Sequence, residues 1–291
     1  MNRWLQNNLP RIVVAPSFAA VIVFVYGFIA WTAYISLTKS RLLPKYEYEG
    51  WLQYIRLWNM PRWHVAIENL FVYSGLFIIF CMALGLLLAI LLDQRIRAEG
   101  ALRTIYLYPM ALSFIVTGTA WKWILNPGFG IEKVMHEMGF ENFEFNWLVD
   151  SEMAIYTIVI AGVWQSSGFV MAMFLAGLRS VDEEIIKAAY MDGVSLPRIY
   201  LGIIIPSMRP VFLSAFVVLS HLAIKSFDLV IALTKGGPGY ATDMPATFMY
   251  AMAFQRGRIG TAAASATIML ITVMAIIVPY LYSELRQKND D

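Results

Sequence analysis

The sequence has little charge and almost no cysteine or histidine. Only 14% of its 291 residues are charged, one residue is Cys and three are His. The lone Cys81 excludes a disulfide framework and a cysteine metal site. His64, His136 and His221 are scattered without the spacing of metal ligands. We therefore expect no metal site in this chain.

Motifs for nucleotide and nucleic-acid binding are also missing. The sequence has no Gly-x4-Gly-Lys-Ser/Thr, which is the loop that holds phosphates in many ATPases. Its net charge of +2, without any basic run, is too weak to predict nucleic acid as a partner. The apolar segments contain no nucleophile beside a base. We expect that the chain is not an enzyme, that it binds no cofactor itself, and that ATP hydrolysis would require a second polypeptide.

Long apolar runs dominate the rest of the sequence. Hydrophobic residues make up 59% of the chain, and about 20 apolar residues suffice to cross a bilayer. The runs are too long for barrel strands, so they predict an all-α polytopic membrane protein with one transmembrane domain over residues 1–291. The six expected transmembrane helices cover residues 12–38, 70–92, 102–125, 154–178, 210–233 and 261–283.

Arginines near the apolar runs predict an orientation. Arg3 and Arg11 precede the first run, which is too long for a signal peptide and is expected to stay as a helix. With six transmembrane helices both termini lie on one side, together with the Arg-rich short loop 93–103. Because short loops with Lys and Arg stay inside, we expect cytoplasmic termini.

A polar segment at residues 182–209 separates two apolar runs. Asp182 is expected to cap a short helix, Gly193 to end it in a left-handed conformation, and Ser195 to cap a second helix. A small helical knob between membrane segments predicts a docking element for another protein.

The spacing of this segment resembles the E-A-A loop of permease subunits of ATP-binding-cassette (ABC) importers. Lys187-Ala188-Ala189, Gly193, Ile203, Ile205 and Pro206 fall on the motif positions, although Lys187 stands where the family has Glu. The resemblance implies a type I importer permease fold and a cytoplasmic ATPase that contacts the loop. The implied ATPase-coupling residues are Glu183, Glu184, Lys187, Ala188, Ala189, Asp192, Gly193 and Pro206.

A second motif follows the fifth apolar run. Gly236-Gly237-Pro238 predicts a turn, expected on the external side. Together with Thr234, Thr242 and 260–264 it resembles the first permease of the paired maltose-type sugar permeases. This resemblance implies import of a mono- or oligosaccharide across the cytoplasmic membrane of a bacterium or archaeon. The implied partners are a second permease subunit, an ATPase dimer that binds ATP and Mg, and an extracytoplasmic sugar-binding protein.

Ionisable residues inside the fifth run need a partner or a cavity. His221, Lys225 and Asp228 stand at i, i+4 and i+7, which predicts one face of a helix on which Lys225 and Asp228 are close enough to pair. Two interpretations stay open: a structural ion pair between helices, or the polar wall of a translocation path.

The fourth run carries small and polar residues near its middle. Such residues either permit close helix packing or donate hydrogen bonds to a polar ligand. The resemblance to sugar permeases implies that the path is lined by Gln165, Ser166 and Phe169 of this run and by Ala223 and Ser226 of the next. Ala223 cannot supply a side-chain hydrogen bond.

Other functions also fit parts of the sequence. The polar residues of the fifth run are compatible with an importer of another polar solute, with a proton relay in a secondary transporter, or with a membrane-embedded enzyme. The segments 39–68 and 126–152 are expected outside the membrane, and 39–68 mixes Trp and Tyr with charges of both signs. This composition predicts either an aromatic belt at the headgroup level or a docking surface for an external partner.

Overall fold

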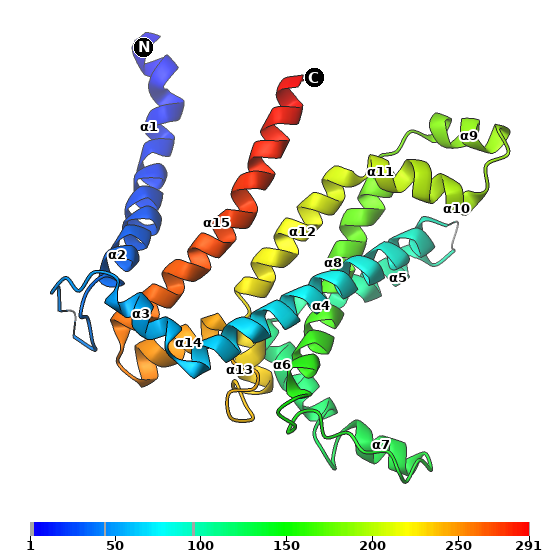
Figure 1. The fold of residues 1–291 in the computed structure, drawn as a ribbon. Coiled ribbons are helices and arrows are strands. Elements are labelled where there is room, and N and C mark those ends of the chain that lie inside the picture. Colours follow the sequence, from blue (N-terminus) through cyan, green and yellow to red (C-terminus); the bar gives the residue numbers. More distant parts are fainter. Residues whose placement is uncertain (1–2, 44, 95–96, 291) are drawn as a thin grey trace. The chain divides into compact units, whose positions relative to one another are not determined.

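A computed structural model describes residues 3–43, 45–94 and 97–290 of the chain, and its elements are helices (Figure 1). The α-helices are α1 (Arg3–Val21), α2 (Phe28–Ile35), α3 (Leu52–Trp58), α4 (Pro61–Asp93), α5 (Glu99–Leu107), α6 (Phe114–Ile124), α7 (Ile131–Glu137), α8 (Ala154–Leu178), α9 (Glu183–Met191), α10 (Leu196–Ile199), α11 (Ile205–Ser207), α12 (Arg209–Ile224), α13 (Asp228–Leu233), α14 (Pro245–Tyr250) and α15 (Ile259–Asp290). The π-helical segments η1 (Ile22–Gly27), η3 (Tyr200–Ile204) and η4 (Ala251–Gln255) and the 3-10 segment η2 (Tyr108–Ala111) connect some of them. Strand pairing in the described residues is a single bridge between Thr38 and Tyr48.

Four helical segments are long and apolar enough to cross a membrane by themselves. They are Arg11–Ile35, Pro61–Asp93, Ala154–Leu178 and Ile259–Tyr282. Each overlaps one of the apolar runs from which a transmembrane helix was expected, and Ala154–Leu178 has the same bounds as the expected 154–178. Two bent helix pairs bring the number of candidate spans to as many as six.

The first bent pair covers the span expected over 102–125, which is therefore two helices and not one continuous helix. Glu99–Ala111 and Phe114–Ile124 are bent by 99°. Pro109 lies in η2, where it cannot donate the backbone hydrogen bond that an α-helix needs. Ser113 is extended, and its side chain accepts a hydrogen bond from the Val116 amide at 3.3 Å. This cap starts α6 as a separate helix.

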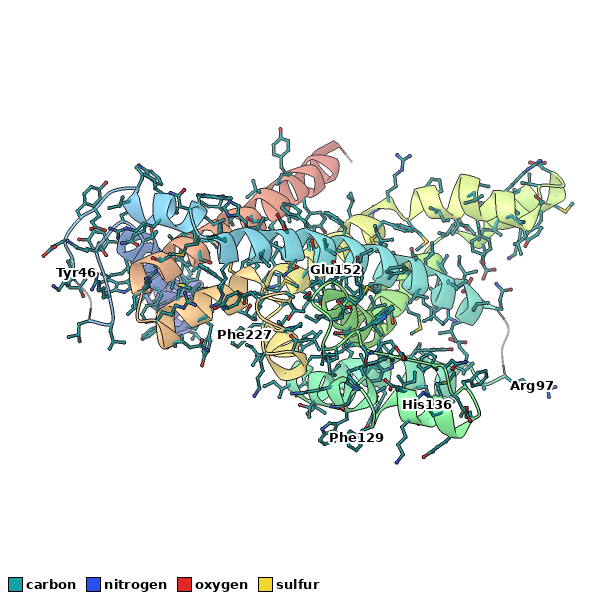
Figure 2. All side chains as sticks on the ribbon, turned by 60° about the horizontal axis from the view of Figure 1, so that its bottom comes forward. Tyr46, Arg97, Phe129, His136, Glu152 and Phe227 are labelled. Carbon is teal, nitrogen blue, oxygen red and sulfur yellow. The ribbon has the colours of Figure 1, made fainter. Side chains whose placement is uncertain are left out.

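The second bent pair lies before and within the fifth apolar run. Leu196–Ser207 and Arg209–Ile224 are bent by 67°. The helix that starts at Arg209 then ends at Ile224, and α13 begins only at Asp228. Between them Phe227, labelled in Figure 2, has φ −124° and ψ −58°, which is not helical. The continuous helix expected over 210–233 is therefore wrong.

Contacts within the chain group the residues into two compact units. One consists of Met1–Trp63 and Phe248–Leu270, and the other of His64–Thr247 and Ile271–Asp291. The division passes through α4 and α15, which are continuous helices. A single transmembrane domain stays a prediction, and the two units are described separately below.

Close helix packing in the larger unit depends on glycine. A Cβ on Gly168 of α8 would collide with the Tyr106 carbonyl oxygen of α5. On Gly118 of α6 it would lie 2.6 Å from the Ala232 Cβ of α13, and on Gly85 of α4 it would meet Val170 of α8 at 2.7 Å. These contacts explain why small residues recur in the apolar runs, because they let backbones approach each other.

In the smaller unit, a buried glutamine connects the loop after α2 with α3 and α15. Gln53 is only 4% exposed, and its amide donates to the Thr38 carbonyl oxygen at 3.0 Å and accepts from the Thr261 hydroxyl at 3.0 Å. Trp63 packs on Phe248 with ring centroids 5.1 Å apart. These contacts fix the long loop against the starts of two apolar helices.

Candidate functional site

The break between α12 and α13 borders a small polar cavity. The cavity has a volume of about 110 Å³, and its polar lining comes from Lys225, Ser226 and Asp228. Aromatic rings form much of the remaining wall: Tyr73, Phe77, Phe114 and Phe227. Lys225 and Asp228 are exposed, whereas Ser226 is buried and interacts with the Tyr73 hydroxyl. The wall of this small cavity therefore combines ring faces with hydrogen-bonding groups of both kinds.

The expected helical stripe of three ionisable residues does not form. Because the helix ends at Ile224, Lys225 and Asp228 are not one turn apart on a helix face. No ion pair joins Lys225 and Asp228 in the part of the chain that the structure describes, so the expected pair is also absent. His221 borders a different crevice, against Val273 and Ile277 of α15. A proton relay through the three residues has no continuous geometry here.

Gln165 holds the bend of the third candidate span. Its side chain is 3% exposed, and the amide nitrogen donates to the Leu112 carbonyl oxygen at 2.7 Å. The amide oxygen is buried and has no hydrogen-bond partner among the described residues. Leu112 lies between η2 and α6, where the helix bends. The glutamine therefore satisfies a carbonyl that the break leaves without a helical partner.

Three other expected path residues do not line the 110 Å³ cavity. Ser166 is buried, Phe169 is half-buried, and neither lines the cavity between α12 and α13. Ala223 is buried and is likewise not part of the lining. In this structure the fourth-run and fifth-run residues thus do not meet across that cavity.

A larger cavity in the same unit is mostly apolar. It has a volume of about 890 Å³ and is bounded by residues of α4, α5 and α8 and by aromatic side chains, including Trp121, Trp147 and Trp164. Ser167 is the one hydroxyl of an aliphatic side chain in this lining. Because this wall is so apolar, it offers few hydrogen-bond partners to a polyhydroxylated solute, and the cavity is a poor sugar site. No local sequence pattern predicts this cavity, because its lining residues come from separate segments of the chain.

The segment from α9 to α10 folds as two short helices around a turn. The Asp182 carboxylate accepts a hydrogen bond from the Glu184 amide at 2.9 Å, so the expected cap is confirmed. Gly193 has φ +73°, as expected for the residue that ends α9. Ala188 is exposed and Ala189 is buried, while Asp192 forms the end of α9.

Lys187 has an acidic partner within its own helix. Its ammonium donates to the Glu183 carboxylate at 2.9 Å, one turn earlier, and both side chains are largely exposed. This hydrogen bond and the charge of Glu183 raise the pKa of Lys187. The contribution of the charged Lys187 ammonium is therefore present at neutral pH and is lost as the pH rises through that raised pKa.

The second helix of the segment differs from the expectation at its start. Ser195 is extended and precedes α10, but its side chain makes no cap hydrogen bond. The Ser195 carbonyl oxygen instead accepts from the Arg198 and Ile199 amides. Pro206 does not end the segment, since it lies inside α11, which follows η3. The expected side-chain cap at Ser195 is wrong.

A charged network that the sequence did not predict ties the residue after α8 to the end of α4 and the start of α5. The Arg179 guanidinium contacts the Glu99 carboxylate at 2.7 Å and the Asp93 carboxylate at 3.6 Å. Hydrogen bonds to these two carboxylates raise the pKa of Arg179, and Glu99 has the larger effect. The Gln94 amide also donates to the Tyr200 hydroxyl at 3.4 Å, beside the α9–α10 segment. Arg95, which contributed to the predicted orientation, lies outside the described residues.

The Gly236-Gly237-Pro238 turn is held by threonine hydroxyls. Thr234 and Thr242 are hydrogen-bonded at 2.7 Å, and the Thr242 hydroxyl donates to the Gly237 carbonyl oxygen at 2.8 Å. The Asn69 amide on α4 donates to the Ala241 and Asp243 carbonyl oxygens, each at 2.9 Å. Gly236 has φ +86°, which glycine adopts without strain. Hydrogen bonds within the turn and to Asn69 of α4 thus hold its conformation.

The family model of binding-protein-dependent transport system inner membrane components matches residues 81–287. The match includes the bent fifth segment, the α9–α10 segment and the Gly-Gly-Pro turn. The chain belongs to this family. It is an ABC transporter permease, and as a family member it is an integral inner membrane component.

Relatives and solved structures agree with the family. The permease is 39% identical to a probable ABC transporter permease of Pyrococcus horikoshii, over 94% of this chain and 96% of that protein. It is 37% identical to a xylose/arabinose import permease of Haloferax volcanii, over 93% of this chain and 86% of the relative. A bacterial ABC transporter involved in the import of the acidic polysaccharide alginate contains a chain of the same fold, with a TM-score of 0.84, 19% identity and 97% coverage of both chains. The expected type I importer permease fold is confirmed.

Proposed function

We propose that this permease forms half of the translocation path of an ATP-driven importer for a mono- or oligosaccharide, which an extracytoplasmic binding protein delivers. The similarity to a xylose/arabinose import permease supports a sugar as the solute. The cavity at the α12–α13 break supports it chemically, because aromatic rings lie next to Lys225, Ser226 and Asp228. Since Lys225 and Asp228 are exposed in the single chain, a second permease subunit would complete the path around them.

The observation that carries an ATP-driven mechanism is the α9–α10 segment, which would dock on an ATPase dimer. This segment presents apolar side chains to solvent: Met191 is 88% exposed, and Ile185 and Tyr190 are each 51% exposed. Exposed apolar side chains gathered on a pair of short helices are typical of a protein contact surface. ATP and Mg would bind to the ATPase, so the segment and both termini would lie in the cytoplasm.

The Arg179 network supports a route for the motion. Arg179 joins the end of α8 to Asp93 and Glu99, and the α9–α10 segment starts directly after it. A push on α9 by the ATPase would therefore reach α8, which carries Gln165 and Ser166. The Gln165 amide oxygen has no hydrogen-bond partner among the described residues, so it would accept a hydroxyl of the sugar once the path opens.

Sugar uptake in cells tests this function. A strain that lacks the permease gene would be complemented with the wild-type chain, and uptake of labelled pentoses, hexoses and oligosaccharides would be measured. We expect the wild-type chain to restore uptake of one sugar class, and depletion of ATP to abolish it while a proton uncoupler at constant ATP does not. Affinity purification of the tagged chain should also retain an ATPase and a second permease. Uptake that follows the proton gradient, or purification without an ATPase, would contradict the proposal.

A further inference from the structure

The smaller unit contains a pocket whose charged lining is entirely positive. The pocket has a volume of about 570 Å³, which is ample for a small ligand. Five cationic side chains line it, and no carboxylate does: Lys39, Arg41, Arg56, Arg256 and Arg258. We call this the cationic pocket. Like charges gathered in one concave site repel each other, and an anion inside the pocket would relieve that repulsion.

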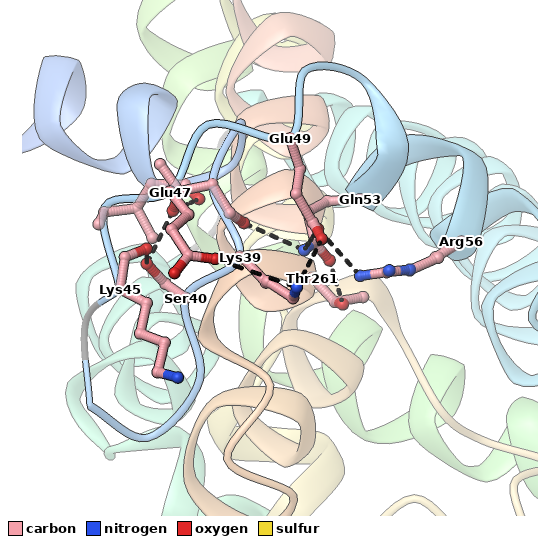
Figure 3. Close-up of polar contacts among 10 residues, drawn as sticks. Lys39, Ser40, Lys45, Glu47, Glu49, Gln53, Arg56 and Thr261 are labelled. Carbon is pink, nitrogen blue, oxygen red and sulfur yellow. Dashed lines mark hydrogen bonds and ion pairs between the residues drawn. The ribbon is translucent and has the colours of Figure 1, made fainter.

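Hydrogen bonds link the residues at the floor of the cationic pocket (Figure 3). Gln53 and Thr261, which are hydrogen-bonded at 3.0 Å, both belong to its lining and are buried. Gln53 also donates to the Glu49 carboxylate at 3.1 Å, and the Gly260 amide donates to the Ser40 carbonyl oxygen at 2.9 Å. These bonds place the cations without the help of a ligand.

Only part of the positive charge is balanced within the protein. Glu49, just outside the lining, contacts Arg56 at 3.1 Å and Lys39 at 3.9 Å. Arg41 and Arg258 are exposed, and neither has an acidic partner among the residues that the structure describes. An arginine fork matches the oxygen atoms of a phosphate or carboxylate, so both side chains are available to an anion.

The position of the cationic pocket in the chain places it at the membrane surface. Lys39 lies four residues after Ile35, where the first span ends, and Met60 directly precedes the second span. Arg258 directly precedes the last span. Three apolar helices thus end or begin at the pocket, which puts its cations at the level of lipid headgroups.

Neighbouring aromatic and apolar side chains also support a position of the pocket at the level of the lipid headgroups. Tyr46 packs against Trp31 and Tyr34 of the first span, with ring centroids 5.6 and 6.4 Å apart. Rings of this kind form the aromatic belt that marks the interface between water and lipid. Beside Arg41, the side chains of Leu42 and Leu43 are 71% and 78% exposed. Acyl chains would cover these leucines, whereas the acidic surface of a soluble protein would leave them in water.

We propose that the cationic pocket binds the phosphate of an anionic phospholipid headgroup, with Arg41 and Arg258 as its principal ligands. The acyl chains then lie along Leu42, Leu43 and the first span. The site holds a structural lipid at one end of the three helices, and it does not depend on which solute the permease carries.

Lipid titration of the full-length, delipidated chain in a zwitterionic detergent tests the proposal. The probes are phosphatidylglycerol, phosphatidylcholine and inorganic phosphate, and the readouts are bound lipid by native mass spectrometry and the melting temperature. We expect phosphatidylglycerol to bind at one site and to raise the melting temperature, phosphatidylcholine to bind at least tenfold more weakly, and phosphate alone to have no effect at the same concentration.

Variants locate the site. A cation near a lipid phosphate contributes roughly a fivefold change in affinity, so Arg41→Gln with Arg258→Gln should weaken phosphatidylglycerol binding about 25-fold. Lys45→Gln is the matched control, because Lys45 lies on the same loop outside the pocket lining, and it should bind like the wild type. Arg258→Lys keeps the charge and should keep most of the binding, which separates lost affinity from misfolding.

Three results would overturn the inference. One is equal binding of the two phospholipids, and another is equal loss of binding in Lys45→Gln and in the double variant. The third is a double variant that binds phosphatidylglycerol normally but loses affinity for the purified extracytoplasmic binding protein. That last result would make the pocket a contact for acidic side chains of a protein.

Discussion

Gly193 offers the sharpest test of the α9–α10 segment. Its φ is +73°, in the left-handed region, and an added Cβ would meet no atom within 4 Å. Gly193→Ala therefore introduces backbone strain without a steric clash. A left-handed conformation costs a residue with a Cβ about 1–2 kcal/mol.

This strain determines the expected loss of ATPase affinity. In the undocked permease, the turn of Gly193→Ala can relax to a conformation that no longer fits the ATPase, and docking must then restore the strained turn. The binding free energy should weaken by this strain of about 1–2 kcal/mol, which corresponds to a dissociation constant roughly 5–30 times higher. The change should leave the spans untouched, because no side chain surrounds the position.

A second glycine provides the control. Gly139, after α7, has φ +96°, and an added Cβ there would also meet no atom within 4 Å. Gly139→Ala thus carries comparable strain away from the docking segment. The dissociation constant of the ATPase, measured with purified permease in nanodiscs, should increase in Gly193→Ala and stay at the wild-type value in Gly139→Ala. Equal affinities of the two variants, or a normal affinity of Gly193→Ala, would refute the role of this turn in docking.

Three further predictions concern single side chains. Gln165→Leu loses the hydrogen bond to the Leu112 carbonyl but also removes a buried amide oxygen that has no partner among the described residues, so the melting temperature should change little. Sugar uptake should fall roughly five- to hundredfold, because the lost hydrogen bond to the sugar is worth about 1–3 kcal/mol. Normal uptake would show that Gln165 is not part of the path. Lys187→Ala should leave the melting temperature unchanged, because the pair of Lys187 with Glu183 is exposed. It should reduce sugar-stimulated ATPase activity less than Glu184→Ala does, and the opposite order would contradict a coupling role of Glu184. Arg179→Gln should free the end of α4 and the start of α5 from α8, so trypsin should cleave the permease faster near these helix ends, and Arg179→Lys should be cleaved more slowly than Arg179→Gln. Identical cleavage of the wild type and Arg179→Gln would show that the ion pairs do not hold these helix ends.

The helices and the local turns follow from neighbouring residues. The run 154–178 coincides with α8, because a long stretch of apolar residues without a strong helix breaker forms a helix in a membrane whatever surrounds it. Asp182 caps α9 through an amide two residues away, and Gly193 ends that helix through its own backbone. The motif spacing of this segment was sufficient to indicate the permease family, which the family model confirms.

The candidate path was less predictable. The pattern of His221, Lys225 and Asp228 fits a helix face only if the helix continues, and hydropathy alone does not reveal the break after Ile224. At the break, Ser226 is buried beside Tyr73, a residue more than a hundred positions earlier in the chain. Packing against such a distant segment decides whether an apolar run stays straight.

The sequence by itself thus determined where the long apolar helices lie, where the α9–α10 segment lies and which family the chain belongs to, because these depend on composition and on spacing within a few turns. Only the tertiary structure decided that Gln165 bonds to Leu112, that Arg179 joins two carboxylates near the loop after α4, and that five cations from separate segments share one pocket. Each of these contacts joins residues far apart in the chain. Their free energy depends on how the helices pack, and no local pattern records that packing.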